Sequence, residues 1–160
     1  MTGRVGMGFD IHPVSDDVDR PMVLGGLRFD GPGLVGHSDS DVIAHACADA
    51  LLGAAGMGDI GSHFPDTDPA LAGADSIELL RTIGDEVRAA GWRLANIDCS
   101  VVCDRPKIAP HREAMQERLS AAAGGPVTVK GKRPEGIGAL GRGDGVACWA
   151  VAMLEREDPS

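Results

Sequence analysis

The chain has 160 residues, of which 43% are hydrophobic, and its formal net charge is -9. This length and composition predict one globular domain over residues 1–160 and argue against disorder. The negative charge argues against nucleic acid as a partner, and the lack of an eighteen-residue apolar run argues against a membrane span. The four cysteines lie far apart among apolar neighbours, which predicts reduced core thiols and a cytoplasmic protein.

The first strand is expected over residues 4–12, where apolar and polar residues alternate. Asp10 and His12 are two positions apart, so they lie on one face of this strand. An Asp-x-His pair suits zinc, because the carboxylate and the imidazole project in parallel toward one point. The spacing therefore predicts two candidate metal ligands on one strand face.

A helix is expected from about residue 39 to residue 55, with Ser38 or Asp39 as its cap and Gly56 as its end. His45 lies four residues from an aspartate on either side, so all three side chains share one helical face. Two interpretations follow. His45 is either a metal ligand with carboxylate partners or a surface histidine on an acidic stripe.

The rest of the chain alternates between strands and helices. The last expected strand is apolar on both faces, which predicts that both faces are buried. Loops rich in glycine lie at residues 58–69 and 136–145. The order predicts an α+β two-layer sandwich, with one mixed sheet and helices on one side. The expected elements are a hairpin over 22–29, a helix from 75 to 91, a strand over 92–103, a helix over 111–123, and strands over 127–130 and 146–154.

Asp10, His12 and His45 form an Asp/His/His set drawn from a strand end and a helix. Three protein ligands with an open fourth position are typical of catalytic zinc, whereas a structural zinc site is closed and usually rich in cysteine. The glycine loops, with Lys107 and Arg142, offer donors for phosphate oxygens. These residues predict an enzyme that acts on phosphate groups with two metals, or with zinc and magnesium.

Longer motifs extend in one order along nearly the whole chain. They are GFDIH at 8–12, GHSDSDV at 36–42, HACADALLGA at 45–54, GDIG at 58–61, FPDTDP at 64–69, GADS at 73–76, RPKI at 105–108 and GRGDG at 141–145. In these motifs the chain resembles the 2-C-methyl-D-erythritol 2,4-cyclodiphosphate synthase family of the non-mevalonate isoprenoid pathway. Colinear motifs of this length are highly specific.

The resemblance implies a homotrimer with active sites between adjacent subunits. It implies a CMP-releasing phosphorus-oxygen lyase, which converts 4-CDP-2-C-methyl-D-erythritol 2-phosphate into the cyclic diphosphate and CMP. The substrate's own 2-phosphate attacks the β-phosphorus. Side chains then need only to position the substrate and neutralise its charge, as is usual in phosphoryl transfer.

The resemblance also assigns a role to each site residue. Asp10, His12 and His45 are expected to hold zinc or another divalent transition metal, and Glu135 to hold magnesium or manganese with the substrate. Substrate contacts are expected from His37, Ser38, Asp59, Gly61, Phe64, Asp66 and Arg142. The nucleotide is expected to contact the neighbouring subunit's Cys103, Pro106, Lys107 and Ile108. Arg133 stands where the family has threonine, and it is expected to bind the nucleotide by taking over the contacts to the α- and β-phosphates. His37 and Arg133 are the residues expected to stabilise the transition state.

The chain departs from the family in the stretch before its glycine loop. The family usually has Lys-Ala-Thr-Thr-Thr-Glu there, whereas residues 130–135 of this chain read Lys-Gly-Lys-Arg-Pro-Glu, and Ala139 replaces an aromatic residue at the trimer axis. Two alternatives stay open: a zinc-binding trimeric paralogue with altered or lost cyclase activity, and a non-catalytic metal-binding or assembly protein. The retained Glu135, Arg142 and Asp/His/His set favours the cyclase.

Overall fold

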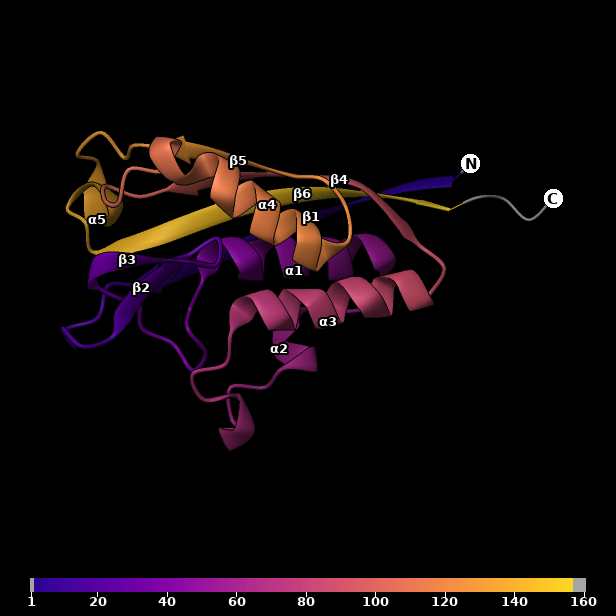
Figure 1. Cartoon of the computed structure of the whole chain (residues 1–160), viewed down its shortest axis with the longest axis horizontal. Helices are drawn as coiled ribbons and strands as arrows, with labels where there is room; N and C mark the ends of the chain where they lie inside the picture. Colours follow the sequence, from indigo (N-terminus) through magenta and orange to yellow (C-terminus); the bar gives the residue numbers. More distant parts are fainter. Residues whose placement is uncertain (1, 157–160) are drawn as a thin grey trace.

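The structure, a computed structural model, describes residues 2–156 (Figure 1). Its main sheet has the strand order β1-β6-β4-β5; β6 is antiparallel to β1 and β4, and β5 is parallel to β4. Strands β2 and β3 pair as a separate hairpin. The bounds are β1 Thr2–Pro13, β2 Pro21–Leu24, β3 Leu27–Pro32, α1 Val42–Ala55, α2 Ile60–His63, η1 Pro69–Leu71, α3 Ser76–Ala89, β4 Arg93–Val102, η2 Ala109–His111, α4 Arg112–Ala123, β5 Val127–Lys132, α5 Gly138–Gly141 and β6 Gly145–Arg156.

Helices α1, α3 and α4 lie on one side of the main sheet (Figure 1). Helix α1 packs on β1 and β6, α4 packs on β5, and α3 packs mainly against α1 and α4. The predicted α+β architecture with a mixed sheet is confirmed, and the hairpin turns at Gly25 and Gly26 as expected. Within residues 2–156, no helix has both the length and the apolar character needed to cross a membrane.

The cap of helix α1 is Asp41, and the prediction of Ser38 or Asp39 is wrong. The Asp41 carboxylate accepts hydrogen bonds from two N–H groups of the first helical turn and from the N–H groups of Gly25 and Gly26. Burial raises the pKa of Asp41 to about 6, and the hydrogen bonds from the hairpin oppose that rise. One buried carboxylate therefore ties the hairpin turn to the start of α1.

Two glycines allow helix α1 to lie directly against β1. Gly6 and Gly8 are buried on the inner face of the strand. A Cβ added to Gly8 would overlap the backbone of Ala46 and Ala50, and one added to Gly6 would overlap the backbone of Ala50 and Ala54. The strand and the helix thus meet backbone to backbone, with no side chain between them.

The face of β1 and β6 that points away from the helices is apolar and exposed. The prediction that both faces of the last strand are buried is wrong for β6 in the single chain, where Trp149, Val151 and Met153 are 39% to 47% exposed. Apolar patches of this kind are typical of surfaces that a partner covers. The large apolar residues on this outer face are Val5, Met7, Phe9, Ile11, Trp149, Val151 and Met153.

We predict that Gly8→Ala lowers the free energy of unfolding by about 1–3 kcal/mol or more, because its methyl group would force α1 away from β1. Urea denaturation of the metal-free protein measures this change. Gly53→Ala is the matched control, since a Cβ at Gly53 would make only ordinary contacts at 3.8 Å and alanine favours the helix. Equal stability of the two variants would contradict the close-packing argument.

Candidate metal centre and ligand-binding surface

Asp10, His12 and His45 meet where β1 lies against α1. Asp10 Oδ2 lies 3.1 Å from His12 Nε2 and 3.0 Å from His45 Nδ1. One ligand atom from each side chain lies within 4.8 Å of the other two, and all three residues are partly buried. Because Gly8 brings the backbone of Ala46 onto the strand, the neighbouring His45 reaches Asp10. Among residues 2–156, no other group of three His, Cys, Asp or Glu side chains meets as closely.

Hydrogen bonds on the far side of each imidazole determine which nitrogen carries the proton. His12 Nδ1–H donates to the Val35 carbonyl oxygen at 2.6 Å, since a carbonyl can only accept. Ser76 gives its hydroxyl proton to the Asp39 carboxylate, so His45 Nε2–H donates to Ser76 Oγ at 2.8 Å. His12 Nε2 and His45 Nδ1 therefore each keep a lone pair.

Both lone pairs face the Asp10 carboxylate, which can also only accept. Such atoms repel one another at these distances unless a proton or a metal cation lies among them. Burial raises the pKa of Asp10, but protonation of the facing imidazole nitrogens supplies hydrogen bonds and positive charge that outweigh it and lower that pKa to about 2. One carboxylate oxygen and two imidazole nitrogens fit a divalent transition metal.

The aspartates on either side of His45 are not its partners, so the interpretation of a helical face with carboxylate partners is wrong. Asp41 caps α1, and Asp49 Oδ1 accepts the Ile60 N–H at 2.8 Å. The carboxylate that contacts His45 is Asp10, which comes from the strand. Asp49 instead ties the start of α2 to α1.

The loop before α1 places the two predicted phosphate contacts differently. Ser38 Oγ lies 3.2 Å from His45 Nε2, the imidazole nitrogen that faces away from Asp10. His37 Nε2–H donates to the Asp68 carbonyl oxygen at 2.6 Å, which ties this loop to the segment before η1. Ser38 thus contacts the outer edge of one candidate ligand, whereas His37 contacts the 64–69 segment.

Four further predicted substrate residues lie on or just after α2. Asp59 caps this short helix and accepts from the N–H and the hydroxyl of Ser62. Gly61 and Asp66 are exposed, and Phe64 is partly buried. These residues therefore present a polar surface with one aromatic ring.

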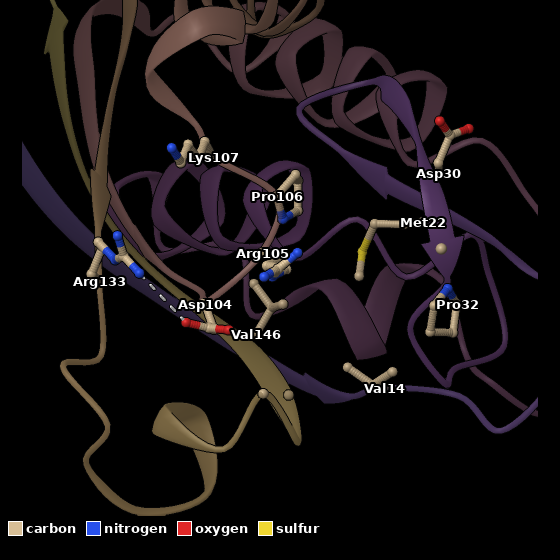
Figure 2. Close-up of a pocket in the computed structure, with 13 residues that line it drawn as sticks. Val14, Met22, Asp30, Pro32, Asp104, Arg105, Pro106, Lys107, Arg133 and Val146 are labelled. Carbon is tan, nitrogen blue, oxygen red and sulfur yellow. Dashed lines mark ion pairs between the residues drawn. The ribbon is translucent and has the colours of Figure 1, made fainter.

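All five predicted nucleotide contacts line one cavity of about 300 Å³ between the β4–α4 loop and the end of β5. They are Cys103, Pro106, Lys107, Ile108 and Arg133. Three of them also border a cavity of about 830 Å³ that continues to the β2–β3 hairpin (Figure 2). In Figure 2 the Arg133 guanidinium points toward Asp104, 3.9 Å from its carboxylate. Neither cavity is lined by a candidate metal ligand.

Glu135 and Arg142 lie in the glycine-rich segment between β5 and β6. Glu135 is exposed and has a left-handed backbone conformation, with φ of 52°. Arg142 pairs with Asp144, whose Oδ2 lies 2.9 Å from Arg142 Nη2. Neither residue lines the two cavities described above, and neither contacts the candidate metal ligands within the chain.

The fold and the converging lone pairs define an α+β protein with a candidate metal centre. The model of the YgbB family matches residues 3–155, and the chain belongs to this family.

Two curated relatives match nearly the whole chain. The 2-C-methyl-D-erythritol 2,4-cyclodiphosphate synthase of Bordetella petrii is 52% identical over 157 residues, which are 96% of this chain and 96% of that protein. The bifunctional enzyme IspD/IspF of an Anaeromyxobacter species is 52% identical over 155 residues, which are 95% of this chain but 40% of the relative's length. Among solved structures, the IspF–CDP complex of Plasmodium falciparum has a TM-score of 0.83 at 30% identity, covering 98% of this chain and 97% of that one.

We predict that His45→Ala removes tight binding of Zn²⁺, used here as a probe, because the loss of one of three ligands breaks the site. Bound metal is measured by elemental analysis after dialysis. His63→Ala is the matched control, because His63 also lies 3.0 Å from a carboxylate, that of Glu86, but has no second imidazole beside it. A His45→Ala protein that still holds about one Zn²⁺ per chain would refute the assignment.

Proposed function

We propose that the chain is a 2-C-methyl-D-erythritol 2,4-cyclodiphosphate synthase. It converts 4-CDP-2-C-methyl-D-erythritol 2-phosphate into the cyclic diphosphate and CMP, as a phosphorus-oxygen lyase of the non-mevalonate isoprenoid pathway. The observation that carries this proposal is the convergence of three lone-pair donors in a chain of this family. The name of the Bordetella petrii relative, 52% identical along 96% of both chains, supports the reaction.

Zinc, or another divalent transition metal, is the proposed occupant of Asp10, His12 and His45. Two neutral imidazoles and one carboxylate make a three-ligand set that leaves one tetrahedral position open. When bound there, the cation supplies positive charge for a phosphate oxygen of the substrate. The Val35 carbonyl and Ser76 keep the imidazole protons on the far side, so the ligand lone pairs stay available.

Magnesium or manganese is proposed to enter with the substrate and to be held by Glu135. A carboxylate oxygen suits either of these hard cations, which usually share their ligands between protein and phosphate. Glu135 is exposed and flanked by Pro134 and Gly136, so it is open to an incoming diphosphate. A second cation is needed because a chain of net charge -9 would otherwise repel a polyanion.

The CDP part of the substrate is proposed to occupy the cavity lined by Cys103, Pro106, Lys107, Ile108 and Arg133. Its volume of about 300 Å³ fits a small group, and the cations that line it suit phosphate oxygens. These cations are Lys107, Arg112, Lys132 and Arg133. The CDP complex of the Plasmodium falciparum relative supports a ligand of this class. The methylerythritol phosphate is proposed to contact His37, Ser38, Asp59, Gly61, Phe64, Asp66 and Arg142, with His37 and Arg133 stabilising the transition state.

A homotrimer with sites between adjacent subunits accounts for two observations. Within one chain, the candidate metal ligands and the candidate nucleotide residues form separate sites. The outer face of β1 and β6 is apolar and exposed, as is expected of a surface that packs on another subunit. Neighbouring subunits would bury this face and bring the two half-sites together.

The alternative of a paralogue with altered activity rests on the Lys132-Arg133-Pro134 sequence. Arg133 borders both cavities, so a cation remains available where the family usually has threonine. An arginine gives charge-assisted hydrogen bonds, which are roughly twice as strong as those of a neutral hydroxyl. This favours retained binding of the diphosphate and thus the cyclase.

We predict that the unmodified protein, with Zn²⁺ and Mg²⁺, releases CMP and the cyclic diphosphate in equal amounts from the CDP-linked substrate. His45→Ala alone and Lys107→Ala alone are expected to be inactive. Mixed in equal amounts, they should recover activity, because roughly one quarter of the interfaces then combine an intact His45 with an intact Lys107. Phosphorus NMR identifies the product, and chromatography measures CMP.

The unmodified protein and the mixture test different parts of the proposal. CMP without the cyclic product from the unmodified protein would support the paralogue, and no reaction at all would refute the cyclase. Mass spectrometry first verifies that subunits exchange in the mixture. If the unmodified protein is then active but the mixture recovers no activity, the shared site alone is refuted.

A further inference from the structure

Arg20, just before β2, lies inside the loop that leads into α1. Its Nη2 is 3.1 Å from the Gly36 carbonyl oxygen, 2.6 Å from the Ser38 carbonyl oxygen and 3.0 Å from Ser40 Oγ. Its Nε donates to the Leu34 carbonyl oxygen. One partly buried guanidinium thus donates to three carbonyl oxygens and one hydroxyl of a single loop.

The same loop carries atoms that orient both candidate histidine ligands. The Val35 carbonyl accepts the His12 Nδ1–H. Val35 lies between Leu34 and Gly36, whose carbonyl oxygens both accept hydrogen bonds from Arg20. Ser38, whose carbonyl Arg20 also holds, places its hydroxyl 3.2 Å from His45 Nε2. This loop therefore contacts both imidazole rings: it supplies the acceptor for His12, and it adds a second contact to His45 beside that from Ser76.

Arginine suits this task better than other residues. Carbonyl oxygens that converge on one point repel one another, and a single positive charge among them removes that repulsion. The planar guanidinium sends its N–H groups in fixed directions, whereas the ammonium of lysine is a compact point charge. The side chain therefore sets the shape of the loop as well as its charge balance.

We propose that Arg20 is a positioning residue of the metal centre: it holds the loop from Leu34 to Ser40 in the shape that aims His12 and His45 at the metal. This inference rests on the proposed metal site. Nothing in the sequence around Arg20 indicates the role, because it follows a polar loop and belongs to none of the motifs. Arg20 makes no hydrogen bond or ion pair with Asp10, His12 or His45. Its positive charge opposes the rise in the pKa of His12 through space, whereas its hydrogen bonds act through the loop.

The test is titration of the metal-free protein with Co²⁺, whose visible spectrum reports both affinity and ligand geometry. Arg20→Ala is expected to weaken Co²⁺ binding about tenfold or more and to change the spectrum, as loss of the partners that orient metal ligands usually does. Arg20→Lys is expected to recover only part of the affinity. Arg118→Ala is the matched control, because Arg118 also donates to a backbone carbonyl, that of Gly26 at 3.2 Å, but in the β2–β3 turn and not in the loop from Leu34 to Ser40.

Each variant is titrated at a temperature where circular dichroism shows that it is folded, so that lost stability is not mistaken for lost affinity. Parent-like affinity and spectrum in Arg20→Ala would overturn the inference. If Arg20→Ala does not fold, Arg20→Lys decides: weaker binding supports the positioning role and unchanged binding overturns it. If the parent binds no Co²⁺, both the metal centre and this inference fail. If the parent binds and Arg20→Ala binds equally well, the inference alone fails.

Discussion

The contact between two glycines of β1 and the backbone of α1 determines where the candidate metal ligands meet. Gly6 and Gly8 leave no side chain between strand and helix, so the helix rests on the strand backbone. The Ala46 carbonyl lies against Gly8, and the preceding residue, His45, is therefore carried to Asp10. A larger residue at Gly8 would separate the helix ligand from the strand ligands, and the site would not form.

The hydrogen bonds around this contact give the site its chemistry. The Val35 carbonyl and the Ser76–Asp39 pair keep the imidazole protons away from Asp10, so three electron-rich atoms face one point. A cation at that point is the arrangement that satisfies all three. In an acidic chain, such a centre also provides positive charge for a phosphorylated ligand, which the surface as a whole would repel.

The sequence predicts features that depend on neighbouring residues, and it misses those that depend on distant ones. The alternation of β1 correctly places Asp10 and His12 on one face, because strand geometry is local. The cap of α1 is missed, since all four residues from Ser38 to Asp41 are of types that can cap a helix and only Asp41 meets the N–H groups of the hairpin. Arg20 is missed for the same reason: its partners lie 14 or more positions along the chain. The expected reaction comes from the family resemblance, and neither composition nor periodicity predicts it.

Calorimetric titration with Zn²⁺ tests the convergence of lone pairs most directly. The metal-free protein is titrated in two buffers of different ionisation enthalpy, so that the difference in heat gives the number of protons released. Burial lowers the pKa of His12, but Asp10 outweighs it and raises that pKa above its ordinary value, so a proton occupies the site at low pH. Zinc must displace this proton. We expect release of about one proton at about pH 6, decreasing as the pH rises through the raised pKa of His12, with weaker zinc binding at the lower pH. Tight zinc binding with no proton release at the lower pH would contradict this expectation.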